Sequence, residues 1–213
     1  PVALADIDHI EVLEGAASRL FGTSAFNGAI NIVTKKAKND GISANVEGGS
    51  FGSFGAQGRV QTAFETGKWT HAYSVSGGYK RSDGGTDNSD FEKGQGYGNL
   101  SFSYDQRFDI IAQLGIATQS YGANTFYSAK YNNQYEKTDH GLASLNLSLH
   151  NQEKTWEIAP QFYYNNFKDH YQLIRGMAGA KAGENYHDLD VYGGGLNANV
   201  AWALGKTAVG FDI

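Results

Sequence analysis

Regular alternation of apolar and polar residues over most of the chain is the feature that most restricts its fold. From Gly41 onward, apolar side chains recur at every second position in run after run. A period of two residues is typical of β-strands whose two faces meet different environments. The clearest runs lie at 42–46, 60–64, 69–75, 100–104, 110–116, 145–149, 156–162 and 196–204, and a further run opens near Thr207. The pattern predicts a mainly β, antiparallel structure of about eight to nine strands over residues 38–213.

The connections between these runs alternate in length. Short polar turns are expected at 65–68, 105–107, 151–154 and 205–206. Longer loops rich in Gly, Asp, Asn and Tyr are expected around 82–95, 120–137 and 170–187, and the connection around 50–55 is a short exception. Short turns at one end and long loops at the other are typical of an outer-membrane β-barrel.

The aromatic residues favour the same architecture. Trp69, Trp156 and Trp202 all lie within a few residues of a predicted short turn, as do Tyr104 and Phe108. Such a ring suits a membrane interface, where amphipathic side chains are best placed. A soluble β-sandwich would also alternate, but its strands would be shorter and its loops less asymmetric. That alternative predicts a chain that is monomeric in buffer without detergent.

Composition and the lack of certain motifs argue against several other classes of protein. No stretch reaches the ~18 apolar residues of a membrane-spanning helix. The net charge of -5 and the lack of a basic stripe argue against a nucleic-acid partner. The six His are scattered, Cys is absent, and neither a zinc-protease nor a nucleophile-elbow motif occurs, so we expect no enzymatic activity.

The first 37 residues have a different pattern. Residues 7–13 and 28–34 read as strands, residues 15–22 as a short helical turn, and Asn27-Gly28 as a turn signal. Lys35, Lys36 and Lys38 then end the second strand. We therefore expect a small α+β unit at 1–37, too short to bury a core of its own.

This first segment resembles the end of the plug domain of TonB-dependent outer-membrane receptors. Residues 7–35, IDHIEVLEGAASRLFGTSAFNGAINIVTK, follow the family pattern almost without a gap. Two positions depart from it: Glu14 replaces a basic residue, which puts in doubt any ion pair between plug and barrel at that side chain, and Ala16 replaces a proline. The resemblance implies the C-terminal part of a plug at 1–37, followed by the N-terminal portion of a plugged barrel of about 22 strands.

The resemblance also implies a function and partners. It implies energy-coupled uptake of a scarce, bulky nutrient across the bacterial outer membrane, driven by the TonB complex, whose contact segment lies outside this chain. Outer-membrane lipid and a small-molecule chelate or corrinoid are the other implied partners, and a surface lipoprotein is a further candidate. No cofactor is required by this reading.

The loop at 82–91 holds the most chemically suggestive residues. It is similar to the calcium-binding loop of cobalamin receptors at Thr86, Asp87 and Asn88, although Ser89 stands where a second aspartate is expected. Carboxylate and amide oxygens are the ligands that Ca²⁺ prefers. The candidate calcium ligands are Asp83, Asp87, Asp90 and Asp139; the alternative is a solvated acidic loop.

Two further loops carry candidate ligand-binding residues. Aromatic side chains in loops supply rigid contact area for a ligand, or else pack loop against loop. The candidates are Tyr121, Asn124, Phe126, Tyr127, Tyr131, Tyr171 and Arg175. Cobalamin or a related corrinoid leads among the expected ligands, with a ferric siderophore or haem as the alternative. A non-transporting surface barrel, such as an adhesin or an omptin-like protease, is the alternative from another class.

Overall fold

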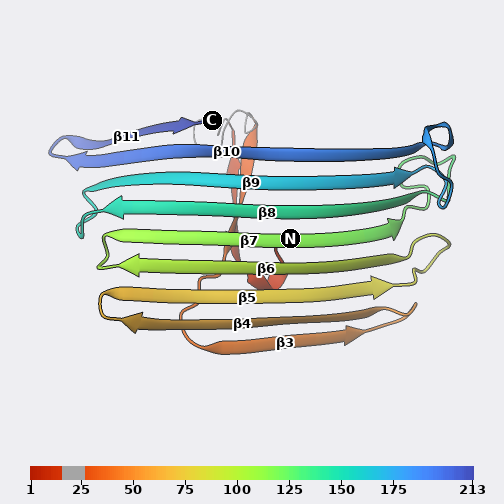
Figure 1. The fold of residues 1–213 in the computed structure, drawn as a ribbon, viewed down its shortest axis with the longest axis horizontal. Helices are drawn as coiled ribbons and strands as arrows, with labels where there is room; N and C mark the ends of the chain where they lie inside the picture. The colour runs from red at the N-terminus through yellow and green to blue at the C-terminus, as the bar shows by residue number, and fades with distance from the viewer. Residues whose placement is uncertain (16–26) are drawn as a thin grey trace.

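The computed structural model describes residues 1–15 and 27–213, and their largest feature is one nine-stranded antiparallel sheet. Its strands follow one another in chain order, each hydrogen-bonded to the next (Figure 1). They are β3 (Gly41–Gly48), β4 (Phe54–Thr66), β5 (Trp69–Ser82), β6 (Phe91–Tyr104), β7 (Phe108–Gly122), β8 (Tyr135–His150), β9 (Trp156–Gln172), β10 (Glu184–Trp202) and β11 (Gly205–Asp212). The predicted mainly β fold and its strand positions are confirmed.

A smaller two-stranded sheet precedes the large one. A 3-10 turn, η1 (Leu4–Asp6), leads into β1 (Ile7–Glu14), which pairs antiparallel with β2 (Gly28–Thr34). In Figure 1 this pair runs across the long strands rather than along them. Both strands lie where the sequence pattern predicted them, whereas the helical turn expected at 15–22 falls, after Gly15, outside the described residues.

The connections differ in length at the two ends of the sheet, as predicted. The right-hand end in Figure 1 carries the long loops 83–90, 123–134 and 173–183, the last of which contains a second 3-10 turn, η2 (Ala180–Ala182). The other end carries turns of two to five residues. The strands reverse within these short turns through residues with positive φ, among them Gly67, Asp105 and Gln106.

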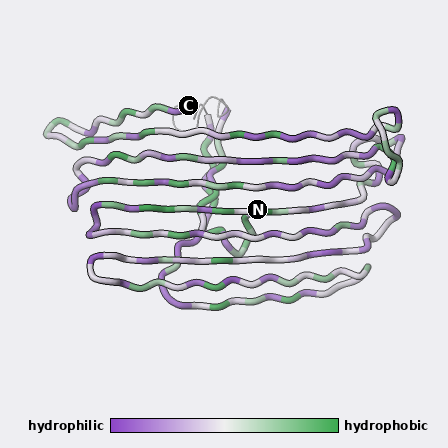
Figure 2. The backbone as a smooth tube through the Cα atoms, in the orientation of Figure 1, coloured by the Kyte–Doolittle hydropathy of each residue, from purple (hydrophilic) through white to green (hydrophobic). Residues whose placement is uncertain are grey.

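Burial on the two faces of the sheet is the reverse of that in a water-soluble protein. On β5, the outward-facing Val75 is 63% exposed, whereas Ala72, Ser74 and Ser76 on the opposite face are buried. In Figure 2, hydrophobic residues recur along the strands, while the long-loop end is mostly hydrophilic. An apolar outer face with a polar inner face is the arrangement of a barrel wall in lipid.

Aromatic side chains mark both borders of the apolar outer face. Trp69 packs against Tyr104 near the short turns, with ring centroids 4.9 Å apart. Tyr79 lies ten positions along the same face of β5, which is roughly 33 Å of strand at ~3.3 Å per residue. A strand tilted by about 40° then spans roughly 25 Å of bilayer, the height of the apolar band of such barrels. Among the described residues, no helix is long and apolar enough to span a membrane.

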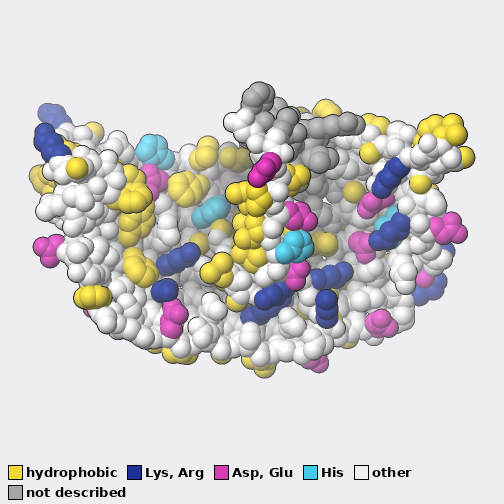
Figure 3. Space-filling model, turned by 180° about the vertical axis from the view of Figure 1, so that it is seen from behind, with side chains coloured by type: hydrophobic (Ala, Val, Ile, Leu, Met, Phe, Trp, Pro, Cys, Tyr) yellow, Lys and Arg dark blue, Asp and Glu magenta, His cyan; other side chains and the backbone are white. Residues whose placement is uncertain are grey.

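The N-terminal segment, residues 1–15 and 27–40, lies against the inner face of the sheet. Seen from behind in Figure 3, the sheet forms a trough, and part of the segment stands in front of its hollow. The outer edges of β3 and β11 have no strand partner in the described part of the chain. The sheet therefore forms an open part of a barrel wall.

Candidate ligand-binding and loop sites

A buried ion pair attaches the N-terminal segment to the inner wall. Asp6, which is completely buried, accepts hydrogen bonds at 2.5 Å from Arg59 Nη1 on β4 and from Ser76 Oγ on β5. Arg59 is only 7% exposed, and its Nη2 also donates to the Lys35 carbonyl oxygen. The carboxylate, guanidinium and hydroxyl thus satisfy one another in a site largely closed to water, which fixes one end of the β1–β2 pair, where β1 begins and β2 ends.

A second group of polar contacts secures the end of β2. The Thr34 hydroxyl receives hydrogen bonds from Tyr97 at 3.2 Å, Asn99 at 3.3 Å and Gln113 at 3.1 Å. These three residues alternate with outward-facing apolar residues on β6 and β7. The polar inner face of the sheet is therefore what binds the segment.

The ion pair to the wall is made by a residue that sequence reasoning did not single out. Glu14, whose identity put such a pair in doubt, is exposed at the end of β1. Asp6 makes the pair instead, with a partner 53 positions away. No local pattern marks Asp6, because it directly precedes the recognisable motif and its partner is set by the sheet register.

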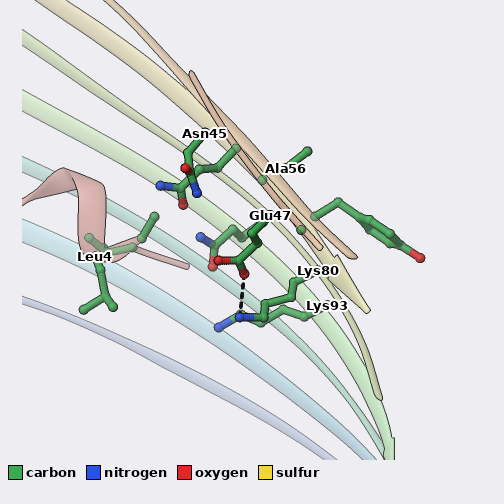
Figure 4. A pocket seen from close by; sticks show the side chains of 13 residues that line it. Leu4, Asn45, Glu47, Ala56, Lys80 and Lys93 are labelled. Atoms are coloured by element: carbon green, nitrogen blue, oxygen red, sulfur yellow. Dashed lines mark ion pairs between the residues drawn. The ribbon is translucent and has the colours of Figure 1, made fainter. Parts of the chain in front are cut away.

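A hollow of about 520 Å³ lies between the N-terminal segment and strands β3 to β6. Val2, Ala3 and Leu4 form one side, and the polar inner face forms the other, with Leu4 and Asn45 on opposite sides in Figure 4. Glu47 and Lys80 form an ion pair of 2.7 Å within it, and Lys93 lies beside them (Figure 4). These charged residues were not among the sequence-based candidates.

The three long loops are joined into one unit at the other candidate site. Arg175 forms a two-pronged ion pair with Asp90, at 2.6 and 3.0 Å, and also contacts the side-chain oxygen of Asn88. Asn88 donates in turn to the carbonyl oxygens of Asn132 and Gln134 in the second loop. The predicted ligand residue Arg175 is therefore engaged in holding the first and third loops together.

Gln134 is the buried centre of this unit. Its side-chain amide donates to the carbonyl oxygens of Tyr131 and Ser128, and its side-chain oxygen accepts from the Tyr171 hydroxyl at 2.9 Å. The residue is 0% exposed. A fully satisfied buried amide fixes loop geometry strongly, because every alternative arrangement leaves a buried polar group unpaired. A glutamine in a polar loop carries no sequence signal of this role.

Several of the predicted aromatic residues do come together. The Tyr121 and Tyr127 hydroxyls lie 2.8 Å apart and both donate to the Glu136 carboxylate, and Tyr127 packs edge-to-face on Tyr171. Phe126 is 77% exposed at the rim of a hollow of about 540 Å³ that Asn124 also lines. Tyr131 instead contributes its carbonyl oxygen to the Gln134 site. Loop packing, one of the two expected roles, therefore has members in this cluster, and ligand contact stays a prediction.

The candidate calcium ligands are not gathered in one place. Asp83 pairs with Arg81 at 2.6 Å, Asp90 pairs with Arg175, and Asp139 lies within β8, opposite Thr118 and Lys168. The backbone oxygen of Asp87 accepts from the Asn124 side chain. In the part of the chain that the structure describes, no three Asp, Glu, His or Cys side chains form a group able to hold a metal ion. Calcium binding stays a prediction that requires these loops to rearrange.

The Asp90–Arg175 pair leads to a pH prediction. The Arg175 guanidinium lowers the pKa of Asp90 below its usual range. Because the folded pKa is depressed, the stabilisation is present above the ordinary pKa of aspartate and is lost as pH falls through the lower folded value. Both side chains are 38% exposed, so we expect at most about 1 kcal/mol.

The chain contains no cysteine, so single spin labels at Thr86→Cys and Ala178→Cys can report the separation of the first and third loops. We expect one narrow distance distribution from pH 7 to about 4 and broadening at lower pH. Asp90→Asn should give the broad distribution at every pH. A distribution unchanged by either acid or Asp90→Asn would contradict the prediction.

We compared the sequence and the fold of the chain with those of known proteins. No family model matches the chain. The Rhizobactin receptor of Rhizobium meliloti (strain 1021) is 28% identical over 145 residues, which cover 64% of this chain and 19% of that protein. In fold, the chain is similar to the siderophore receptor PiuA from Acinetobacter baumannii, with a TM-score of 0.73 and 13% identity over 97% of this chain and 35% of that one.

It is also similar to the ferric-catecholate import receptor Fiu from E. coli K12, with a TM-score of 0.62 and 15% identity over 91% of this chain and 36% of that one. This similarity supports the resemblance to TonB-dependent receptors. Its large sheet matches a fragment of the fold of these receptors, which confirms the expected fold.

The names of these relatives bear on the class of function. All three relatives are named as receptors, in agreement with the expectation of a non-enzymatic function. None of their names refers to a corrinoid, so the expected cobalamin specificity gains no support. The chain spans only 19% of the curated relative that it matches.

Proposed function

We propose that the chain is part of a TonB-dependent outer-membrane receptor that takes up a ferric siderophore. The observation that carries the proposal is that the structure combines a membrane-type sheet with a small β-pair bound to its inner face. A barrel wall has an apolar outer face, and an N-terminal β-pair is bound to its polar inner face through Asp6 and Arg59. The sequence and fold similarity to siderophore receptors supports this reading.

The siderophore alternative is preferred to the leading expectation of cobalamin. The loop that suggested cobalamin, around Thr86 to Asn88, uses its polar groups to bind neighbouring loops: Asn88 contacts the second and third loops, and the Asp87 backbone holds Asn124. The loop thus has a structural role that needs neither calcium nor a corrinoid. We keep cobalamin as an outcome of the test.

The proposed function implies two partners, the TonB complex and outer-membrane lipid. Residues 1–37 are assigned as the end of a plug, and energy from the TonB complex would reach the ligand through a segment outside this chain. The apolar outer face between its aromatic borders would contact outer-membrane lipid.

The test is ligand binding by the receptor that contains this chain, purified in detergent. We would titrate it calorimetrically with a ferric tris-catecholate, a ferric tris-hydroxamate and a ferric carboxylate siderophore, each with its iron-free form as control. Submicromolar binding of one ferric complex, with at least tenfold weaker binding of its iron-free form, is expected. Cyanocobalamin, with and without millimolar Ca²⁺, forms the opposing arm. Binding of cyanocobalamin alone, strengthened by Ca²⁺, would overturn the siderophore assignment.

A further inference from the structure

We propose that Lys80 and Lys93 form an anion-recognition site on the inner wall, which contacts a ferric chelate of net negative charge. The proposal rests on the proposed function and specifies its substrate class. It begins with the register of the sheet: Lys80 on β5 lies directly opposite Lys93 on β6. Like charges directly opposite each other on neighbouring strands destabilise a sheet. The pairing therefore has no structural benefit that would explain it.

Neighbouring groups neutralise only half of this charge. Glu47 on β3 pairs with Lys80 at 2.7 Å, and among the described residues Lys93 makes no ion pair. The other polar side chains that line the hollow are uncharged: the amides of Asn45, Gln57 and Gln95, and Tyr79. The wall of the hollow is thus a cationic surface surrounded by hydrogen-bond donors, a composition that suits an anionic, oxygen-rich molecule.

Glycines keep this hollow open. A Cβ atom at Gly55 would lie 2.8 Å from the Glu47 side chain, and one at Gly78 would lie 3.1 Å from the Cβ atom of Gln57. Both glycines line the hollow. Larger residues at these positions would push Glu47 and Gln57 into the space beside the lysines. The volume of about 520 Å³ falls in the range of small-molecule sites.

The side of the hollow opposite the lysines is apolar, and this restricts which ligands fit. Val2, Ala3 and Leu4 line this side with apolar side chains. A ligand with anionic oxygens on one side and an apolar or aromatic body on the other would satisfy both surfaces. Aryl-oxygen and carboxylate chelators of iron have this chemistry, whereas neutral hydroxamate complexes lack the charge.

The experiment compares two charge-matched double variants of the detergent-purified receptor. Lys80→Gln with Lys93→Gln removes the inner pair. Lys137→Gln with Lys168→Gln removes the same charge from the outward side of β8 and β9, at the same end of the sheet. Each protein is titrated with a negatively charged ferric tris-catecholate, with a neutral ferric tris-hydroxamate, and with inorganic pyrophosphate as an iron-free polyanion.

We expect the inner double variant to bind the ferric tris-catecholate about 10- to 100-fold more weakly, from the loss of one or two charge-assisted contacts. Its affinity should also depend less on salt than that of the wild type. The outward variant should bind like the wild type. Equal weakening of the neutral complex, or no weakening of the anionic one, would overturn the proposal.

Pyrophosphate separates this proposal from the proposed function. If the wild type binds neither ferric complex but binds pyrophosphate, and the inner variant loses that binding, the anion site stands and the siderophore assignment fails. If pyrophosphate also fails to bind, the anion site is overturned. Hydrogen exchange of β5 and β6 in the inner variant provides the folding control, because removing a like-charge pair should leave the strands at least as protected as before.

Discussion

Replacing Arg59 with leucine is expected to detach the N-terminal segment from the barrel wall. The substitution leaves the Asp6 carboxylate fully buried with only Ser76 as a side-chain partner. Breaking a buried pair by removing one partner costs about 3–5 kcal/mol, because an uncompensated charge stays away from water. We expect loss of amide protection across β1 and β2 in the intact receptor, measured by hydrogen exchange, while β5 to β8 keep theirs.

Two controls define this result. Arg81→Leu removes an exposed partner of Asp83, with side chains 48% and 64% exposed, and should cost less than about 1 kcal/mol. The double variant Asp6→Leu with Arg59→Leu removes both buried charges and should restore much of the protection, since well-packed apolar residues often replace such pairs at little cost. Full protection of β1 and β2 in Arg59→Leu would show that the pair does not hold the segment.

Leu145→Arg is expected to destabilise the barrel far more than the same change one residue along the chain. Leu145 lies on the outward face of β8, opposite Ala112 on β7 and Phe162 on β9. Arginine at the lipid-facing midplane of a barrel costs about 2–4 kcal/mol. Asn146→Arg places the same side chain on the polar inner face, where we expect a cost below about 1 kcal/mol.

The measurement is the free energy of unfolding of the two variants from urea titration in the same detergent or lipid. A lower midpoint for Leu145→Arg, with Asn146→Arg close to the wild type, is the expected order. The reverse order would mean that the two faces of β8 are assigned wrongly. Both variants introduce the same side chain at neighbouring positions of one strand, so the comparison reports mainly on the face that receives the arginine.

Much of the architecture was predictable from local pattern. The two-residue period of 69–75 and 100–104 specifies strands and their two faces, because a one-residue slip would move every apolar side chain to the polar side. Loop lengths alternated visibly, and Trp69, Trp156 and Trp202 marked the end with the short turns. The resemblance of residues 7–35 to a plug segment added the order of the two parts.

The candidate sites were predictable only in part. Tyr121, Tyr127 and Tyr171 were selected as loop aromatics and do meet, and Arg175 was selected as a ligand residue and pairs with Asp90. Gln134 was missed, since a single glutamine among polar loop residues carries no pattern. Asp83, Asp87 and Asp90 were chosen as calcium candidates for proximity along the chain, and Asp139 for a resemblance to cobalamin receptors. Neither criterion ensures proximity in space.

By itself, the sequence determined which segments are strands, which of their faces meets lipid and which end carries the long loops, because alternation and turn chemistry act between near neighbours. Only the tertiary structure decided that Asp6 meets Arg59, that Lys80 lies opposite Lys93, and that three loops close around Gln134. These pairings join residues between 13 and 53 positions apart. They depend on strand register and on the position of the N-terminal segment within the trough, and no local period encodes either.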